Sequence, residues 1–357
     1  MNTFAVLAVL ACALLVTRFF LQHVALKGLS VSRLFGKPAV FAGEEGELVE
    51  TVINDRPMLI PWLRVESRIP AALRLGRQEN LEVSGDLYHQ SLFTVMPYQR
   101  IIRRHRVRFL RRGVFDVGNA ALTAGDVTGL ITATREQQMA ARVIVYPRPM
   151  AERELPEPFL RLTGEEVLQR RLLSDPFLIR GLRPYLPGDP VRDIHWPATA
   201  RSGITQLRLH DDTAAVRLLV VINGQLRENQ WDQLADWEEE IIERNISMAA
   251  ALCLRALRQG MAAGFAANLM MDTGEAVFLP EGGDSRAEAL LTAMARLKMR
   301  RTLSFPSFLS TLNPRRGTDI AVISAYDSPE IQRQLARLRQ MGCSTLLHLS
   351  GRGEADA

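Results

Sequence analysis

The sequence lacks most of the features on which functional assignments usually depend. Its cysteines are too few and too far apart for a disulfide framework or a Cys-x-x-Cys pair: Cys12, Cys253 and Cys343. This usage is typical of a reducing compartment. The zinc-protease, phosphate-loop, dinucleotide-binding and nucleophile-elbow patterns are all missing from the 357 residues. We therefore expect a non-enzyme with no catalytic residue and no cofactor, and the sequence identifies no small-molecule substrate.

Aromatic residues are also scarce, at 6% of the chain. The most basic segment, residues 100–112, contains seven arginines and no acidic residue. Aromatic side chains do not alternate with these arginines, as a stacking platform for nucleic acid would require, so we expect no nucleic-acid partner. Two interpretations of the segment stay open. It is either a solvated strand face with structural arginines, or a lipid-sensing surface around Arg103 to Arg112.

Only one apolar run is long enough to span a bilayer. Residues Phe4 to Val16 include no polar side chain, and apolar residues resume at Phe19. A helix of this length rises about 30 Å, the thickness of the hydrocarbon core. We predict a transmembrane anchor over residues 1–24, with the lipid bilayer as its partner. Basic residues follow the run, at Arg18, Lys27, Arg33 and Lys37. This charge bias predicts a single-pass protein of the cell membrane with most of its chain in the cytoplasm.

Beyond the anchor, the hydrophobic pattern divides the chain. Residues 29–148 contain short β-rich stretches separated by turn residues, which predicts a β-sandwich. A Pro/Glu-rich linker is expected over residues 149–165. Residues 213–351 alternate apolar strand-like runs with helical periodicity, which predicts an α/β domain with a parallel sheet covered by helices on both sides. Acidic residues near its first helix are expected to form a solvated face, or alternatively a docking face for a basic partner: Asp232, Asp236, Glu238, Glu239, Glu240 and Glu243.

The segment over residues 166–212 contains the densest group of special residues. Its charged, aromatic and glycine positions are Arg183, Tyr185, Gly188, Asp189, Arg192, Asp193, His195, Trp196 and Arg201. The aspartates are suited to bidentate pairing with the arginines. Three interpretations are open: a salt-bridge network within the fold, an interaction surface, or an acid–base or metal centre built from Asp189, Asp193 and His195. We expect His195 and Trp196 in an extended segment, with Tyr185 and Trp196 either plugging a domain junction or anchoring a partner.

This segment resembles the signature of a bacterial family called domain of unknown function fifty-eight. That signature reads Arg-x-Tyr-x-x-Gly-Asp, then Arg-x-Ile-x-Trp, then Ala-Arg, and it is matched between Arg183 and Arg201. The resemblance implies a membrane anchor, a β domain and a Rossmann-like domain of the von Willebrand A type. It also implies an association with MoxR-type AAA+ ATPases, beside which relatives are typically encoded. No catalytic activity is established for the family.

One departure from the von Willebrand A pattern concerns metal binding. Domains of this type that bind Mg²⁺ use Asp-x-Ser-x-Ser after the first strand, because a hard cation prefers oxygen ligands. Here Asn223, Gln225 and Arg227 occupy those places, and Asp327 corresponds to a later ligand. We therefore interpret Asn223, Gln225 and Asp327 as a degraded metal site and expect no bound metal.

The sequence predicts a membrane-anchored cytoplasmic adaptor or scaffold that acts through protein–protein interaction. Its α/β domain is expected to dock a partner such as a MoxR-type AAA+ ATPase, in the assembly or regulation of a complex. The alternative is a metal-dependent hydrolase that uses Asp189, Asp193 and His195.

Overall fold

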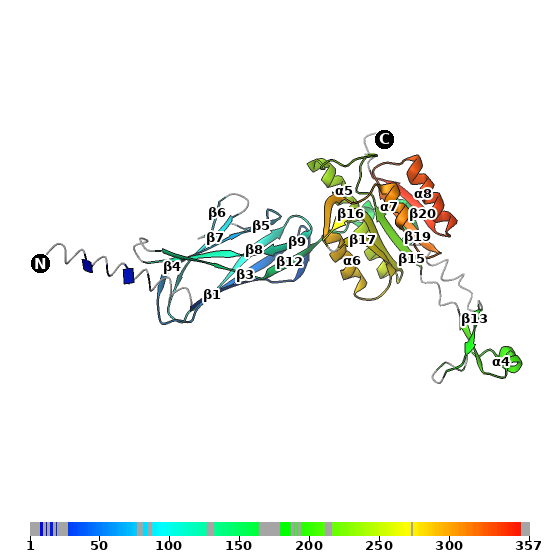
Figure 1. Ribbon diagram of the computed structural model, residues 1–357, viewed down its shortest axis with the longest axis horizontal. Helices are drawn as coiled ribbons and strands as arrows, with labels where there is room; N and C mark the ends of the chain where they lie inside the picture. The colour runs from blue at the N-terminus through cyan, green and yellow to red at the C-terminus, as the bar shows by residue number, and fades with distance from the viewer. Residues whose placement is uncertain are drawn as a thin grey trace. The chain divides into compact units, whose positions relative to one another are not determined.

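The computed structural model describes most of the chain beyond the predicted anchor. The described residues are 28–76, 81–84, 88–126, 132–163, 179–186, 189, 191, 194–210, 216–272 and 274–350, with six separate positions between 8 and 19. The predicted membrane segment over residues 1–24 lies outside them, apart from those six positions. Among the described residues, no helix combines the length and the apolar character needed to cross a membrane. The chain divides into two compact units, Met1–Arg148 and Pro149–Ala357 (Figure 1).

The first unit is built from strands. They are β1 (Leu29–Phe35), β2 (Ala39–Phe41), β3 (Glu45–Asn54), β4 (Ile60–Arg68), β5 (Leu73–Leu75), β6 (Leu81–Ser84), β7 (Tyr88–Val95), β8 (Arg100–Phe109), β9 (Gly113–Val117), β10 (Ala120–Gly125), β11 (Thr132–Gln137) and β12 (Ala141–Tyr146). Three sheets result, with the orders β1-β3-β8-β5, β11-β10-β4-β7-β6 and β2-β12-β9. All pairs are antiparallel except β2 with β12. The predicted β-sandwich is confirmed.

Alternation along the strands places apolar side chains between the sheets. Leu29 and Val31 of β1 and Val52 of β3 share a buried cluster with residues of β4, β7 and β10. At one border the sheets are joined by side-chain hydrogen bonds. The Gln137 side chain of β11 donates to the Val31 carbonyl at 2.6 Å, and Arg135 donates to the Leu29 carbonyl at 3.0 Å. These bonds satisfy carbonyls of the edge strand β1 and connect it to the facing sheet.

The second unit begins with a structured segment. We predicted a linker over residues 149–165. Its described part instead contains a short 3-10 helix, η3 (Glu152–Glu154), and the helix α2 (Glu157–Thr163). Phe159 and Leu162 are buried, and Arg255 of the helix α5 (Asp236–Arg258) donates to the Thr163 hydroxyl at 2.8 Å. The apolar pair at i and i+3 gives α2 a face that packs, which the surrounding Pro and Glu residues obscure in the sequence.

The α/β part of this unit follows the predicted alternation. Its strands are β15 (Arg217–Ile222), β16 (Ala262–Met271), β17 (Gly274–Glu281), β18 (Leu297–Arg301), β19 (Thr318–Ser324) and β20 (Ser344–Leu349). The order is β17-β16-β15-β19-β20, with β18 also paired to β16. β15, β16, β19 and β20 are parallel, whereas β17 and β18 run antiparallel to β16. An α/β domain with a mostly parallel sheet is therefore confirmed.

Helices cover both faces of this sheet (Figure 1). Leu219 and Val221 of β15 join one buried cluster with α7 (Phe305–Thr311) and α8 (Pro329–Gln340). The alternate residues of β15 point to the opposite face, where α5 packs on β15 and β16 and contacts α6 (Arg286–Ala295). Because both faces are covered, β15 is apolar after Arg217, as the sequence indicates, and β19 is buried along its whole length with an apolar centre over residues 320–323. β18 and α7 were not anticipated.

Residues of the predicted signature segment form a β-hairpin with an inserted helix. β13 (Ile179–Pro184) pairs antiparallel with β14 (Gln206–His210), and α4 (Trp196–Ser202) lies between them in the chain.

Candidate functional site

Arg183 and Asp189 of the signature segment form a bidentate ion pair. The Arg183 guanidinium donates from Nη1 to Asp189 Oδ2 at 2.6 Å and from Nη2 to Oδ1 at 2.8 Å. The Leu186 amide also donates to Oδ2 at 2.8 Å, and the Tyr185 hydroxyl donates to the Asp189 carbonyl at 3.1 Å. The hydrogen bonds from Arg183 and then from Leu186 lower the pKa of Asp189. Asp189 therefore acts as an ionised acceptor that holds this turn together.

His195 caps a helix. Its Nδ1 accepts a hydrogen bond from the Ala198 amide at 3.0 Å, at the N-terminus of α4. Trp196 is the first residue of α4, so our prediction of an extended segment at Trp196 is wrong. The chain turns into the helix at His195, and Pro197 favours the first helical turn. Trp196 is 64% exposed, and Arg201 lies exposed in the last turn.

The proposed catalytic group of Asp189, Asp193 and His195 is only partly visible. Gly188, Arg192 and Asp193 lie outside the described residues. Within the described part of the chain, Asp189 and His195 share no hydrogen bond or ion pair, because Asp189 is engaged by Arg183 and His195 by α4. Asp189 and His195 therefore each stabilise local structure, and the hydrolase hypothesis stays a prediction.

A second group of polar residues lies at the carboxyl edge of the parallel sheet. Asn223 follows β15 directly, and its Nδ2 donates to Ser324 Oγ, at the end of β19, at 2.9 Å. The Asn223 Oδ1 accepts from the Gln225 amide at 2.9 Å. From β16, Asn268 Oδ1 accepts from the Gly224 amide at 2.6 Å. All of these side chains are buried, so neutral amides connect the ends of three adjacent strands.

Two glutamines and one glutamate extend this arrangement. Gln225 accepts from the Phe305 amide at 2.8 Å, and Gln230 accepts from the Leu226 amide at 2.9 Å. The Gln230 Nε2 donates to Glu238 at 2.9 Å, and the second Glu238 oxygen accepts from the Ala235 amide at 2.9 Å. We expected Glu238 on a solvated acidic face, but it is buried because it closes the first turn of α5.

These side chains do not fit a divalent cation. The Asn223 and Gln225 oxygens both accept backbone N–H groups, and the Asn223 Nδ2 donor is directed at Ser324. Asp327 is exposed and accepts from the Gln332 side chain at 2.7 Å. A hard cation prefers several oxygen ligands, commonly with carboxylate charge among them, and this edge offers amide oxygens that are already in use. In the described residues, no group of three or more His, Cys, Asp or Glu side chains is arranged to hold a metal.

The same edge carries two exposed tryptophans. Trp231 lies in the connection between β15 and α5 and is 56% exposed, and Trp237, in the first turn of α5, is 60% exposed. Nearby, Arg227 pairs with Asp232 at 3.3 Å and approaches Glu238 at 3.7 Å. Tryptophan and arginine are both enriched at protein interfaces, and tryptophans are frequent hot spots there.

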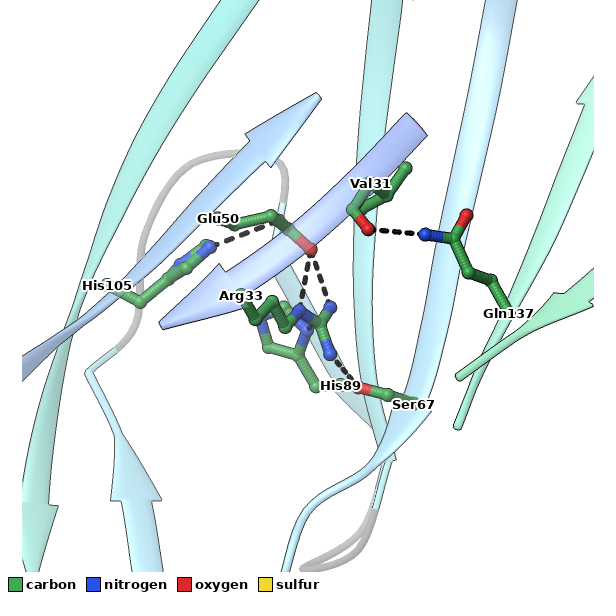
Figure 2. A network of polar contacts seen from close by, with 7 residues as sticks. All are labelled: Val31, Arg33, Glu50, Ser67, His89, His105 and Gln137. Carbon is green, nitrogen blue, oxygen red and sulfur yellow. Dashed lines mark hydrogen bonds and ion pairs between the residues drawn. The ribbon is translucent and has the colours of Figure 1, made fainter. Parts of the chain in front are cut away.

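A third polar group is buried inside the β-sandwich, and Figure 2 shows it between the two sheets. Arg33 of β1 donates to Glu50 of β3 from Nε at 2.8 Å and from Nη2 at 2.6 Å. The other sheet contributes Ser67, which accepts from Arg33, and His89, whose Nδ1 accepts from Arg33 Nη2 at 3.2 Å. His105 of β8 donates to Glu50 at 3.3 Å. The guanidinium therefore links the two sheets.

The ionisation of this cluster follows from its contacts. Burial favours the neutral form of Glu50, but the hydrogen bond from His105 and the charge of Arg33 outweigh it and lower the Glu50 pKa to about 2. Burial and then the Arg33 charge lower the pKa of His89 to about 3. An imidazole that accepts from a guanidinium must be unprotonated at that nitrogen, which agrees with this direction. At neutral pH the cluster is a buried Arg–Glu pair with a neutral His89.

Sequence reasoning missed this cluster, although a signal was present. Arg33 is in phase with the inward residues Leu29 and Val31, and Glu50 is in phase with Leu48 and Val52. Charged residues at two inward positions of a period-two pattern indicate a buried pair. No comparable signal identifies Asn268 or Ser324, because their contacts depend on the order of strands in the sheet.

A comparison with protein families identifies the second unit. Residues 181–341 match the family described as "Protein of unknown function DUF58". The chain carries a DUF58 family domain. The DUF58 domain thus includes Arg183, Asp189 and His195, together with the amide residues at the carboxyl edge. No curated protein matches the chain significantly.

Several solved structures resemble part of the chain weakly. A Salmonella alpha-2-macroglobulin variant is 16% identical over 33% of this chain and 9% of its own length, with a TM-score of 0.27. The CARDB domain of a Pyrococcus furiosus protein, solved with di-metal ions, is 15% identical over 31% of this chain and 91% of its own, with a TM-score of 0.20. An Acetivibrio cellulolyticus cohesin, solved with a dockerin, is 10% identical over 32% and 99%, with a TM-score of 0.22. Likenesses this low support no inference about function.

Proposed function

We propose that this protein is a membrane-anchored cytoplasmic adaptor whose DUF58 domain docks a protein partner at the carboxyl edge of its parallel sheet. The observation that carries this proposal is the pair of exposed tryptophans, Trp231 and Trp237, at an edge whose buried polar groups bond to one another. Such an edge presents an apolar surface to a partner. The Asn223 and Gln225 oxygens that a metal would need already accept backbone hydrogen bonds.

The strand topology supports a von Willebrand A-type fold for the α/β part of the second unit. The strand order β17-β16-β15-β19-β20, with an antiparallel β17, is consistent with a Rossmann-like domain of the von Willebrand A type. Ligands of open α/β sheets bind beyond the carboxyl ends of the strands. That position is where Asn223 and Ser324 meet and where Trp231 and Trp237 lie. In this chain we infer that an apolar protein contact takes the place of a cation.

The proposed partner class is a MoxR-type AAA+ ATPase, as the family resemblance implies. The predicted span over residues 1–24 would hold the adaptor at the cell membrane. The basic residues that follow it would keep the folded units in the cytoplasm. The adaptor would then bring its partner to a membrane complex that is being assembled or regulated.

Capture from solubilised membranes tests the proposal. The full chain is the bait, and an AAA+ ATPase is the expected enriched protein. W231A/W237A should reduce its capture at least about tenfold, because buried tryptophans are frequent hot spots of interfaces. The variant should keep the wild-type thermal stability, since both side chains are exposed.

Trp196→Ala is the matched control, because Trp196 is a similarly exposed tryptophan of the same unit. It should capture as much ATPase as the wild type. If W196A loses capture while W231A/W237A retains it, the docking surface is the signature hairpin and the proposed edge is wrong. Absence of any ATPase from the wild-type capture would contradict the proposed partner class.

A further inference from the structure

The outward side of the β1-β3-β8-β5 sheet is strongly basic. β8 alternates in the sandwich, so His105, Val107 and Phe109 point inward and the arginines between them point to solvent. β5 adds another exposed arginine. We call this surface the basic face, and its arginines are Arg74, Arg104, Arg106 and Arg108.

The structure separates these residues from the other arginines of the same segment. Arg103 stacks on the Phe93 ring, 4.1 Å from its centroid, and donates to the Leu92 carbonyl at 3.1 Å. Arg112 is buried. The segment therefore combines structural arginines with a solvated strand face, and lipid binding by that face stays a prediction. Arg103 and Arg112 are structural, and the alternate positions of β8 form a solvent-facing charged surface.

The charge of the basic face is only partly balanced. Glu47 pairs with Arg104 at 3.3 Å, and Glu45 is the register partner of Arg108. Among the described residues, Arg74, Arg106 and Arg108 have no ion pair. Arg74 and Arg108 also oppose one another directly in the β5–β8 register. Like charges at such positions repel, and a bound anion would relieve that repulsion.

Exposed apolar side chains lie on the same face. Leu34 of β1 is 64% exposed and Ile102 of β8 is 53% exposed. Both belong to the outward-pointing positions of their strands. Basic residues beside isolated apolar ones suit the boundary between lipid headgroups and acyl chains, where arginine stems lie along apolar surface while their charges contact phosphate.

We infer that the basic face binds the anionic phospholipid headgroups of the membrane to which the chain is anchored. The inference rests on the anchor of the proposed function. Only residues 25–28 separate the predicted span over residues 1–24 from Leu29, where β1 starts, and an extended connection of that length reaches only about 17 Å. The sheet that β1 begins is thus tethered close to the bilayer surface. The attraction of an anionic leaflet falls off within about 10 Å at physiological salt, and Arg106 and Arg108 lie at the end of the sheet away from Leu29, so the basic face engages the headgroups when the sheet lies along the leaflet.

A fluorescent probe on the full chain tests this inference. Ser32 is exposed on the outward side of β1, so Ser32→Cys in a Cys12→Ser background provides a small labelling site. Cys253 and Cys343 are buried and should not react under native conditions. The labelled chain is added to vesicles of phosphatidylcholine alone, or of phosphatidylcholine with one third phosphatidylglycerol, both containing a headgroup-linked quencher. Flotation measures how much chain binds each vesicle.

The expected result is roughly twofold stronger quenching of the probe at position 32 in the anionic vesicles, which raised salt abolishes. R74Q/R106Q/R108Q should remove the difference. R258Q/R300Q/R316Q, which changes three exposed arginines of the other unit, should preserve it. A probe at Thr132→Cys, an exposed position of the facing sheet, should respond equally to both vesicles.

The outcomes distinguish failure of lipid binding by the basic face from failure of the predicted membrane anchor. If the chain floats with both vesicles and the probe at position 32 does not distinguish them, the basic face is refuted and the anchor stands. Flotation with anionic vesicles alone supports the basic face and refutes the anchor. Flotation with neither vesicle refutes both.

Discussion

The two units of this protein each enclose a buried polar group, and the two groups are built on different principles. In the β-sandwich, Arg33 and Glu50 bury a full ion pair between two sheets. In the DUF58 domain, Asn223, Gln225 and Asn268 bury neutral amides at the edge of one sheet. The first group holds its charges by mutual attraction. The second consists of neutral amides, and Glu238, the carboxylate that extends it, accepts hydrogen bonds from Gln230 and Ala235.

The presence or absence of buried charge limits the role that each group can have. A buried ion pair pays a large desolvation cost and tolerates no loss of either partner. It therefore fits a structural link between sheets. Neutral amides can be buried fully when each N–H and C=O finds a partner, and they leave no charge to attract a cation. We propose that the carboxyl edge of the DUF58 domain serves instead as a surface for a protein partner.

The largest expected effect comes from breaking the ion pair. Glu50→Gln keeps the shape of the side chain but leaves the Arg33 charge buried without its counter-ion. We expect the sandwich to lose about 3–5 kcal/mol of unfolding free energy. Urea unfolding followed by hydrogen exchange of β3 peptides measures it. Glu47→Gln, an exposed position on the same strand, is the control and should change stability by less than about 0.5 kcal/mol. A similar loss in both variants would contradict the difference between the two groups.

The corresponding test of the amide group introduces a charge into it. Asn223→Asp places a carboxylate in a fully buried position and removes the donor to Ser324. We expect the DUF58 domain to lose about 2–3 kcal/mol. Asp327→Asn, at an exposed position near the same edge, should be nearly neutral. Thermal unfolding with and without Mg²⁺ sharpens the test. Recovery of wild-type stability by N223D in Mg²⁺ would show that the edge still accommodates a cation.

A smaller effect depends on pH. The folded chain holds the His89 pKa at about 3, whereas the unfolded chain has the ordinary value of 6.5. Below pH 6.5 the unfolded state therefore binds a proton that the folded state does not, and stability falls as the pH decreases toward 3. Between pH 7 and pH 5 we expect a loss of about 2 kcal/mol from this residue. Denaturant unfolding should show that difference between wild type and His89→Gln. Identical pH profiles would contradict the buried, neutral state of His89.

The smallest expected effect is local to the signature hairpin. Arg183→Gln removes the guanidinium that pairs with Asp189, so the pKa of Asp189 should rise toward its ordinary value. An NMR titration of the Asp189 carboxyl carbon measures this directly. Arg201→Gln, an exposed arginine of α4, should leave that pKa unchanged. If R183Q leaves the pKa low, another group holds the Asp189 charge.

The sequence predicts much of this architecture because the period of its apolar residues differs between the units. Alternation predicts the sandwich, and the apolar run over residues 216–222 predicts a central parallel strand that is covered on both faces. The short elements β18 and α7 were missed because a few residues carry too little periodicity. The prediction of an extended segment at Trp196 was wrong because Trp196 is followed by a proline and preceded by a histidine. Both residues are compatible with extended chain, but here they begin the helix α4.

The candidate sites are less accessible to prediction from sequence. The pairing of Arg183 with Asp189 agrees with the expected bidentate geometry, since the two residues are six positions apart across a turn. The Asn223–Ser324 bond joins residues 101 positions apart, and only the adjacency of β15 and β19 brings them together. Sequence reasoning noted that Asn223 replaces a carboxylate, but it had no means to show that the amide is bonded on both sides.

Site-specific photo-crosslinking tests the central claim most directly. A photoreactive phenylalanine analogue is placed in the full chain at position 231, at position 237, or at Leu279, an exposed residue of β17. Membranes are irradiated before solubilisation, and the covalent adducts are identified by mass spectrometry. The adaptor account predicts that positions 231 and 237 capture the same AAA+ ATPase while position 279 captures little. Adducts with that ATPase from position 279, and none from positions 231 and 237, would contradict it.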